Sequence, residues 1–377
     1  MSRHFDSILI GTSPVCVLEG CALKAAGHSP LLIDRAETFG GAWGGVDIPL
    51  VGTVESGPHS LSFSPPTREF ICRTLNLDLK PMTPDPIFVM PRRVFGSYRA
   101  SYRARWPYAA GRIEAEFPRS IAAWRKVINP YYHFMRDLVN SAPRFSNAIE
   151  NVIGGTPVLA KRLEELAHAY HLDVVLGTSV DSVSIDTNAK RVTVQTQDGA
   201  FTADEFVMTT RTALDRIEVD GEMHQVDSKS VSLVQLLLVL DDMPTQSFSF
   251  AQFVDSPNVW LASDLTSSLS VDLQRKGYRV IGIVVTHEIT PGYDAVMCIF
   301  EELCQRGLID ASVKLAGHRW VPFNGPNREA TELAEIENRF RPFVRTLCSD
   351  ALTQCIEDNA QRWDASLSVA PPAERTA

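Results

Sequence analysis

The stretch FDSILIGTSPVCVLEGCALKAAGHSPLLID, residues 5–34, decides the fold of this chain. A short apolar run over 5–10 predicts a β-strand, and the pattern over 17–26 predicts a helix that ends at a glycine, as helices often do. A second apolar run over 30–33 predicts another strand, which ends at Asp34. The stretch therefore predicts a strand–helix–strand unit with an acid at its end.

The turn after the first strand has Gly11, Ser13 and Cys16 where the pattern G-x-G-x-x-G of dinucleotide-binding turns has glycines. In such a turn, backbone N–H groups at the start of the helix receive a pyrophosphate, and the helix dipole favours its charge. Asp34 comes about 20 residues later, where an acid accepts hydrogen bonds from ribose hydroxyls. Ser13 carries a Cβ where backbone should approach phosphate closely. The unit therefore predicts a dinucleotide site with an altered turn.

Further segments extend this pattern along the chain. They are Asp34-Arg35 followed by Gly40-Gly41, Glu55-Ser56-Gly57-Pro58-His59, Gly154-Gly155 before leucines 159, 163 and 166, and the strand-like run 203–210. In order and spacing they resemble the extended fingerprint of a flavoprotein superfamily. That superfamily holds amine oxidases, protoporphyrinogen oxidases, phytoene desaturases, UDP-galactopyranose mutases and the Rab GDP-dissociation inhibitors. The inhibitors, whose turn is the most similar to GTSPVC, are not flavoenzymes.

The resemblance implies an FAD site whose residues carry over position by position. They are Gly11, Ser13, Pro14, Asp34, Arg35, Gly40, Gly41, Ala42, Trp43, Gly57, Pro58, His59, Val180, Thr209, Ser349 and Asp350. Relatives have a Gly-Asp pair near the pyrophosphate where this chain has Ser349-Asp350, so the acid is kept and the glycine is lost. His59 and Trp320 are the candidates for lining the flavin, and no catalytic base is assigned.

Composition narrows the function classes. The 377 residues are 45% hydrophobic and carry a net charge of −9, which is unlike a nucleic-acid-binding protein. The chain has no apolar run of about 18 residues and no signal-peptide pattern, so we expect no membrane span and a cytoplasmic protein. The seven cysteines are scattered without a CxxC pair, which favours reduced thiols, and no ligand spacing supports a metal site.

Residues 92–136 differ from the rest of the chain in charge. They carry ten lysines and arginines against Glu114 and Glu116, a local balance of +8, with aromatic residues interleaved. Three interpretations stay open. The segment caps a site for an anionic substrate, docks an acidic protein partner such as a carrier protein or second subunit, or is a solvated charged face.

We expect an α/β fold in which a Rossmann-like FAD-binding domain is joined to a mixed-sheet substrate domain with a helical insertion. The ranges are 1–80, 150–215 and 315–370 for the FAD domain, 81–149 and 216–314 for the substrate domain, and 371–377 for a disordered tail. The expected function is that of an amine-oxidase-like, FAD-dependent oxidoreductase. It oxidises a C–N or C–C bond of a small, anionic or carrier-bound substrate by hydride transfer to the flavin. The alternatives are an accessory protein that lost the cofactor, which Ser13, Cys16 and Ser349 favour, and a non-redox flavoenzyme like the galactopyranose mutases.

Overall fold

The structure is a computed structural model, and it describes most of the chain outside the basic insertion. The described residues are 3–56, 59, 61–81, 87–90, 93–95, 150–226, 229–242, 244, 248–253, 256–286, 289–347 and 352–369. The tail 371–377, nearly all of the segment 92–136, and the predicted site residues Gly57, Pro58, Ser349 and Asp350 lie outside them.

The first sheet is built around β1, which lies between two parallel neighbours. Ile8 of β1 is beside Leu31 of β2 on one side and beside Phe206 of β12 on the other. β9 continues the sheet beyond β2, and β20 runs parallel to the end of β12. The bounds are β1 (His4–Ile10), β2 (Pro30–Ile33), β9 (Asp173–Val175), β12 (Gly199–Thr209) and β20 (Val344–Leu347). Burial on both faces explains why β1 and β2 are nearly continuous apolar runs.

Four further strands extend this sheet on the β12 side, in the order β14-β13-β10-β11-β12. Their bounds are β10 (Val180–Asp186), β11 (Arg191–Thr196), β13 (Arg216–Val219) and β14 (Glu222–Gln225). The last two lie after residue 215, so the first sheet reaches past the range expected for the FAD domain. The division of the chain into domains itself stays a prediction.

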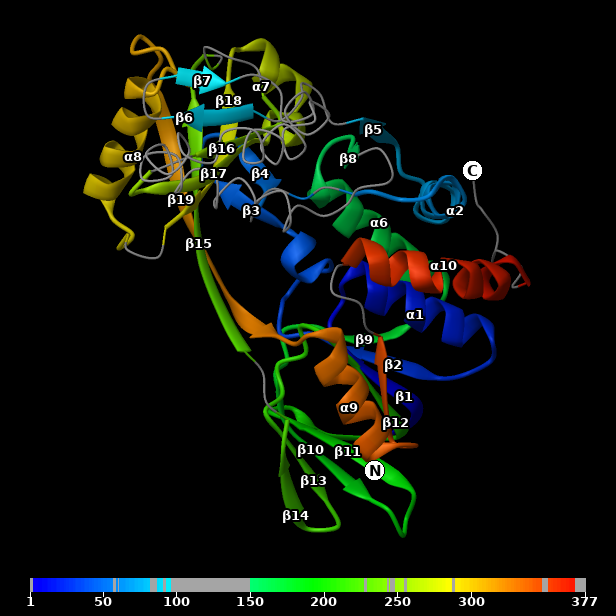
Figure 1. Ribbon diagram of the computed structural model, residues 1–377. Helices are drawn as coiled ribbons and strands as arrows, with labels where there is room; N and C mark the ends of the chain where they lie inside the picture. Colours follow the sequence, from blue (N-terminus) through cyan, green and yellow to red (C-terminus); the bar gives the residue numbers. More distant parts are fainter. Residues whose placement is uncertain are drawn as a thin grey trace, which may run out of the picture.

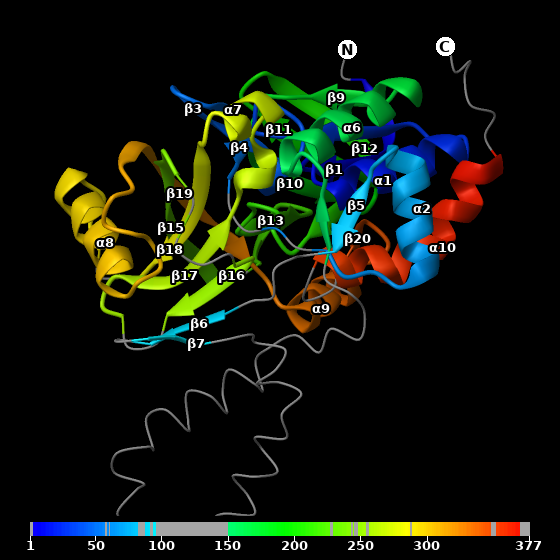
Figure 2. The ribbon, with the colours of Figure 1, turned by 90° about the horizontal axis from the view of Figure 1, so that it is seen from above.

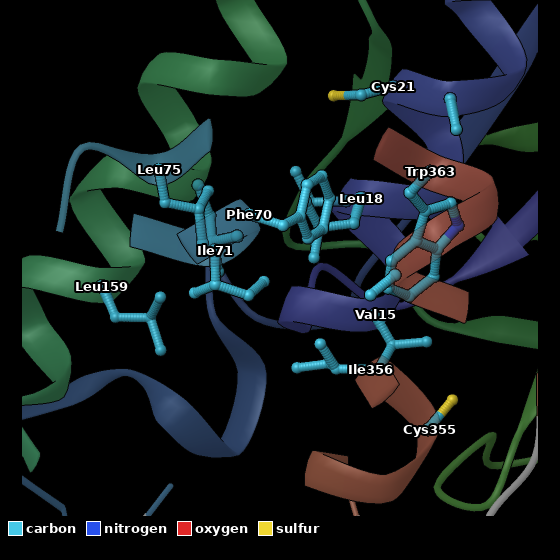
Figure 3. Packing of buried hydrophobic residues seen from close by; sticks show 14 of the residues in the cluster. Val15, Leu18, Cys21, Phe70, Ile71, Leu75, Leu159, Cys355, Ile356 and Trp363 are labelled. Atoms are coloured by element: carbon cyan, nitrogen blue, oxygen red, sulfur yellow. The ribbon is translucent and has the colours of Figure 1, made fainter. Parts of the chain in front are cut away.

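Each face of the parallel strands is covered by its own cluster of apolar side chains. Leu9, Leu32 and Val207 point to one face, and their strand neighbours point to the other because successive side chains alternate. Four helices cover the first face, and α9 (Ala330–Phe340) packs on the second. The four are α1 (Pro14–Ala25), α2 (Pro65–Leu75), α6 (Thr156–Ala169) and α10 (Leu352–Val369). Figure 3 shows Leu18, Phe70 and Trp363 meeting between α1, α2 and α10.

The second sheet has the strand order β19-β15-β18-β17-β16-β6-β7. Its bounds are β6 (Ile87–Met90), β7 (Arg93–Phe95), β15 (Lys229–Leu240), β16 (Phe250–Phe253), β17 (Val259–Asp264), β18 (Arg279–Val285) and β19 (Leu315–Asn327). Helix α8 (Tyr293–Gln305) buries Val296, Ile299 and Leu303 against one face. In Figure 1 the long strands β15 and β19 run from the first sheet into the second, and Figure 2 shows α8 and α10 at opposite ends of the molecule.

A small hairpin lies between the first sheet and the second sheet. It consists of β3 (Gly45–Ile48) and β4 (Gly52–Glu55), which follow the short helix η1 (Gly41–Trp43). Its side chains Ile48 and Val54 pack with Leu237 and Val239 on the face of the second sheet that points away from α8. Short elements complete the fold: β5 (Leu79–Pro81), β8 (Glu150–Val152), η2 (Thr266–Ser268) and α7 (Val271–Arg275).

The predicted fold class is confirmed, because a parallel sheet covered by helices is joined to a second, mixed sheet. The strand–helix–strand unit also forms where the sequence predicts it, although α1 begins three residues earlier than the apolar pattern suggests. Among the described residues, no helix is both long and apolar enough to cross a membrane.

Candidate cofactor site

The turn that follows β1 lies where the strand order of the sheet reverses. From β1 the chain returns through α1 to β2 on one side, whereas β12 pairs with β1 on the other. In open α/β sheets, ligands bind beyond the carboxyl ends of strands at such a switch point. Gly11 begins the turn with φ +110°, a conformation that favours glycine, and its N–H donates to the Ile33 carbonyl at 2.7 Å.

Asp34 is buried at the end of β2 and holds the turn in place. Its Oδ2 accepts hydrogen bonds from the Thr12 N–H at 2.7 Å and the Thr12 hydroxyl at 2.6 Å. Its Oδ1 accepts one from the Ala36 N–H at 2.9 Å. A carboxylate has about four acceptor positions, so these bonds leave capacity for one ribose hydroxyl. The acid therefore fits the predicted role and has a structural role as well.

Helix α1 begins directly at the turn. Ser13 is the N-cap and Pro14 the first helical residue, and the Ser13 side chain makes no capping hydrogen bond to the backbone. Its hydroxyl lies 3.4 Å from the sulfur of Cys16 instead. The N–H groups of the first helical turn have no partners within the helix, and the helix dipole adds positive potential there. These features suit an anion, while the Ser13 side chain occupies space that a glycine would leave empty.

Cys16 is a packing residue in this turn. Burial raises the pKa of its thiol to about 12, and the nearby acids Asp34 and Glu19 add to the rise. Burial also raises the pKa of Cys21, one helical turn further along α1. Neither residue therefore carries the thiolate that would make it a nucleophile at neutral pH.

We expect a thiol reagent at pH 8 to modify Cys298, which is exposed, and to spare Cys16 and Cys21 in the folded protein. Peptide mass spectrometry after timed labelling measures this cysteine by cysteine, with the Cys298→Ser variant as the control for the exposed site. Labelling of Cys16 as fast as that of Cys298 would contradict its placement in the core of the turn.

A glycine pair connects this turn to η1. The Gly40 N–H donates to the Thr12 carbonyl at 3.1 Å, so the two loops touch through their backbones. Gly40 has φ +101°, and a Cβ there would lie 3.0 Å from the Cβ of Ala160. Gly41 also has a positive φ, but a Cβ there would meet open space. Gly40 therefore allows the backbone to come close to Thr12, whereas Gly41 leaves open space next to the chain.

The rings of Trp43 and His59 pack against each other beyond the glycine pair. Their ring centroids are 4.5 Å apart, and the ring planes are tilted by 43°. Nδ1 of His59 lies 3.3 Å from Oε1 of Glu55, whose side chain is 8% exposed. In the sequence, Glu55 is only part of a motif and has no predicted role. A continuous path of contacts therefore leads from the turn at Gly11 through Gly40 and Trp43 to His59.

Trp320 is not part of this path. On β19 it pairs with Leu236, and both side chains pack on the α8 side of the second sheet. Its neighbour Val321 packs on the other side, with the β3–β4 hairpin. The structure therefore places Trp320 on the face opposite the hairpin and does not bring it together with His59.

The remaining predicted residues that the structure describes lie on several different elements. Thr209 lies at the carboxyl end of β12, next to Leu347 of β20, and its N–H donates to the Thr212 hydroxyl at 2.9 Å. Arg35 and Ala42 are exposed. Val180 is half-buried at the start of β10, against the cluster on the α9 side of the first sheet.

A buried arginine near this edge was not predicted from the sequence. Arg328, which follows β19, is 1% exposed and donates hydrogen bonds to the backbone carbonyls of Thr212, Leu214 and Val226. Burial lowers the pKa of its guanidinium. Arg328 therefore fixes the loop after β12 against the end of the strand that joins the two sheets.

Known proteins resemble this chain in structure. Neither the models of known protein families nor the sequences of curated proteins match it. Reduced UDP-galactopyranose mutase matches with a TM-score of 0.66 and 11% identity over 98% of this chain and 96% of that one. Putrescine oxidase bound to putrescine matches with a TM-score of 0.62 and 14% identity over 98% and 99% of the two chains. An oxidoreductase from Methanosarcina mazei matches with a TM-score of 0.64 and 12% identity over 96% and 100%.

At such identities, these likenesses establish the shared fold and leave the reaction open. The predicted fold is therefore confirmed, because this chain shares it with UDP-galactopyranose mutase and putrescine oxidase over nearly its whole length.

Proposed function

We propose that this chain binds FAD and oxidises a C–N or C–C bond of a small substrate, as an amine-oxidase-like oxidoreductase. The observation that carries the proposal is the continuous path at the switch point of the sheet, in which Gly11, Gly40 and Trp43 follow one another. Structural neighbours of the same fold, among them putrescine oxidase, support it.

Each part of this path has a distinct task in the proposal. The N-terminus of α1 binds the pyrophosphate, and the hydroxyl of Ser13 turns to donate to it. Asp34 binds a ribose hydroxyl through its remaining acceptor position. Gly41 leaves space along the cofactor, and the pair of Trp43 and His59 lies at its far end. FAD, when bound, supplies the hydride-accepting chemistry, while the protein binds, orients and excludes water.

One observation favours the alternative of an accessory protein without cofactor. Asp34 already accepts three hydrogen bonds from its own chain, so the turn is stable without a ribose. A non-redox flavoenzyme is the other alternative, supported by the match to a galactopyranose mutase.

Anaerobic mixing with candidate substrates separates the three functions. We expect a small amine to bleach the flavin band near ~450 nm of the FAD-bound protein, because an oxidation reduces the cofactor. A mutase substrate leaves the absorbance of the oxidised protein unchanged and reacts only after chemical reduction. A protein that shows no flavin band at all would rule out both enzymes.

The basic segment 92–136 leads to a separate prediction. If it binds an anionic substrate, we expect KM for that substrate to rise several-fold between about 0.05 and 0.3 M NaCl, because screening weakens its +8 charge balance. A neutral substrate of the same protein serves as the control and should show no rise. Equal KM values for the anionic substrate at both salt concentrations would reject the electrostatic role.

A further inference from the structure

Arg328 is a buried cation that the proposed function does not use. It follows β19 directly, is 1% exposed, and donates hydrogen bonds from its guanidinium to three backbone carbonyls. These belong to Thr212 at 2.5 Å, to Leu214, and to Val226 at 3.1 Å. Its backbone N–H donates to the Thr210 carbonyl at 3.1 Å. A buried charge is costly unless it is hydrogen-bonded, so the place of this guanidinium depends on the carbonyls around it.

The loop that follows β12 is ordered by these bonds. The Thr209 N–H donates to the Thr212 hydroxyl at 2.9 Å, and the Thr212 N–H donates to the Thr209 carbonyl at 3.1 Å. Thr212 is 1% exposed, and the guanidinium of Arg328 holds its carbonyl. Thr209 is therefore linked to Arg328 through a single residue.

This loop lies at the same edge of the first sheet as the candidate cofactor turn. β1 and β12 run parallel, with Leu9 beside Val207. Two residues further along the two chains are Gly11, which begins the turn, and Thr209, which ends β12. Ligands of open α/β sheets bind beyond this edge. A shift of the loop would therefore move backbone next to the proposed FAD site.

Arg328 also lies where the chain crosses between the two sheets. The pairing of β15 with β19 begins at Lys229 and Asn327, and Figure 1 shows both strands running from the first sheet into the second. Arg328 comes directly after Asn327, and its bond to the Val226 carbonyl holds the chain shortly before β15. One side chain therefore connects both crossing strands to the loop after β12.

We propose that Arg328 is a positioning residue for the cofactor site, which it shapes through the loop Thr209–Thr212 without touching the cofactor. This role rests on the proposed function, because the ligand that needs the loop in place is FAD. A lysine keeps the charge but replaces the planar fork of five donors by one compact ammonium. An apolar residue leaves the buried carbonyls without their donor. We therefore expect the mobility of the loop and the affinity for FAD to change together.

Hydrogen–deuterium exchange of the apoprotein measures the mobility of the loop. We expect the amides of residues 209–214 to exchange about tenfold faster or more in Arg328→Lys, and faster still in Arg328→Met. Arg306→Met is the matched control, because Arg306 is 8% exposed and pairs with Glu302 of α8 in the second sheet's cluster. It should leave the exchange of residues 209–214 unchanged. Unchanged exchange in Arg328→Lys and Arg328→Met would overturn the role of Arg328 in ordering the loop.

Titration with FAD, followed by flavin absorbance, measures the effect on the cofactor site. We expect Arg328→Lys to weaken FAD binding by about fivefold or more, and Arg306→Met to bind FAD as the wild type does, although both lose stability. Wild-type affinity in Arg328→Lys, together with faster exchange of the loop, would overturn the positioning role. A wild-type protein that binds no FAD would remove the proposed function and this effect together, while the exchange result would still decide whether Arg328 orders the loop.

Discussion

Replacing Glu19 by glutamine is expected to lower the free energy of unfolding by about 3 kcal/mol. Glu19 lies in the middle of α1 and is fully buried, and its carboxylate accepts hydrogen bonds from three side chains. They are Arg345 at 2.9 Å, Arg362 at 2.5 Å and Trp363 at 2.6 Å. Breaking a buried ion pair costs about 3–5 kcal/mol. We expect the lower end, because both arginines reach solvent and Arg345 keeps its ion pair with Glu205.

The loss of stability in Glu19→Gln should become smaller as the pH falls. Burial acts to raise the pKa of Glu19, but the hydrogen bonds and charges of Arg362 and Arg345 outweigh it and hold the pKa below its ordinary value. A carboxylate with a lowered pKa stabilises the folded state above the pKa of the unfolded chain, about 4.3, and loses this contribution as pH falls through its folded value. The difference between wild type and Glu19→Gln should therefore be constant above about pH 5 and shrink below about pH 4.

Urea unfolding at several pH values measures both expectations. Glu165→Gln, which removes an exposed ion pair with Arg162, is the control and should change stability by less than about 1 kcal/mol. If the Glu19→Gln protein were as stable as this control, the hydrogen bonds and ion pairs of Glu19 would not stabilise the fold.

Replacing Asp34 by alanine is expected to weaken FAD binding by about tenfold or more, because a hydrogen bond to a charged group is worth roughly 1.5–3 kcal/mol. The same change should also lower the stability of the cofactor-free protein, since Thr12 and Ala36 would lose the acceptor for their N–H groups. Titration of the apoprotein followed by flavin absorbance measures the first effect, and thermal unfolding of the apoprotein measures the second.

Thr12→Val separates the two roles of Asp34. Thr12 is fully buried, and valine removes its hydroxyl hydrogen bond while keeping its shape and the acid. We expect this variant to lose stability but to keep most of its FAD affinity. Equal losses of affinity in Thr12→Val and Asp34→Ala would mean that Asp34 acts only through the shape of the turn, and not on the ribose.

Much of the fold could be predicted from the sequence because its signals are local. The apolar run 30–33 and the acid after it mark β2 and its end directly, and leucines 159 and 163 mark the buried face of α6. The partners of Asp34 could not be predicted, because they depend on how the turn at Thr12 folds back on the strand. Glu19 did have a signal, a single acid within an apolar helix, but its partners lie more than 300 residues away in the sequence.

In the candidate site, too, contacts between segments far apart in the sequence could not be predicted. A motif singled out His59 as a candidate, whereas the contact of Glu55 with Gly155 depends on the approach of α6, which follows about 100 residues later in the chain. Trp320 could be assigned to a strand, but its face depends on the register with β15. Since side chains alternate along a strand, a shift of one residue would exchange Trp320 and Val321.

The claim that this protein binds FAD can be tested by its absorption spectrum from 300 to 600 nm. The spectrum is recorded before FAD is added, and again after FAD is added and the excess is removed by gel filtration. We expect flavin bands near ~375 and ~450 nm that stay with the protein. Asp34→Ala should retain less of them under the same conditions. A wild-type protein that stays colourless after FAD is added would contradict the claim, and would mean that the turn with Ser13 and Cys16 has lost its ligand.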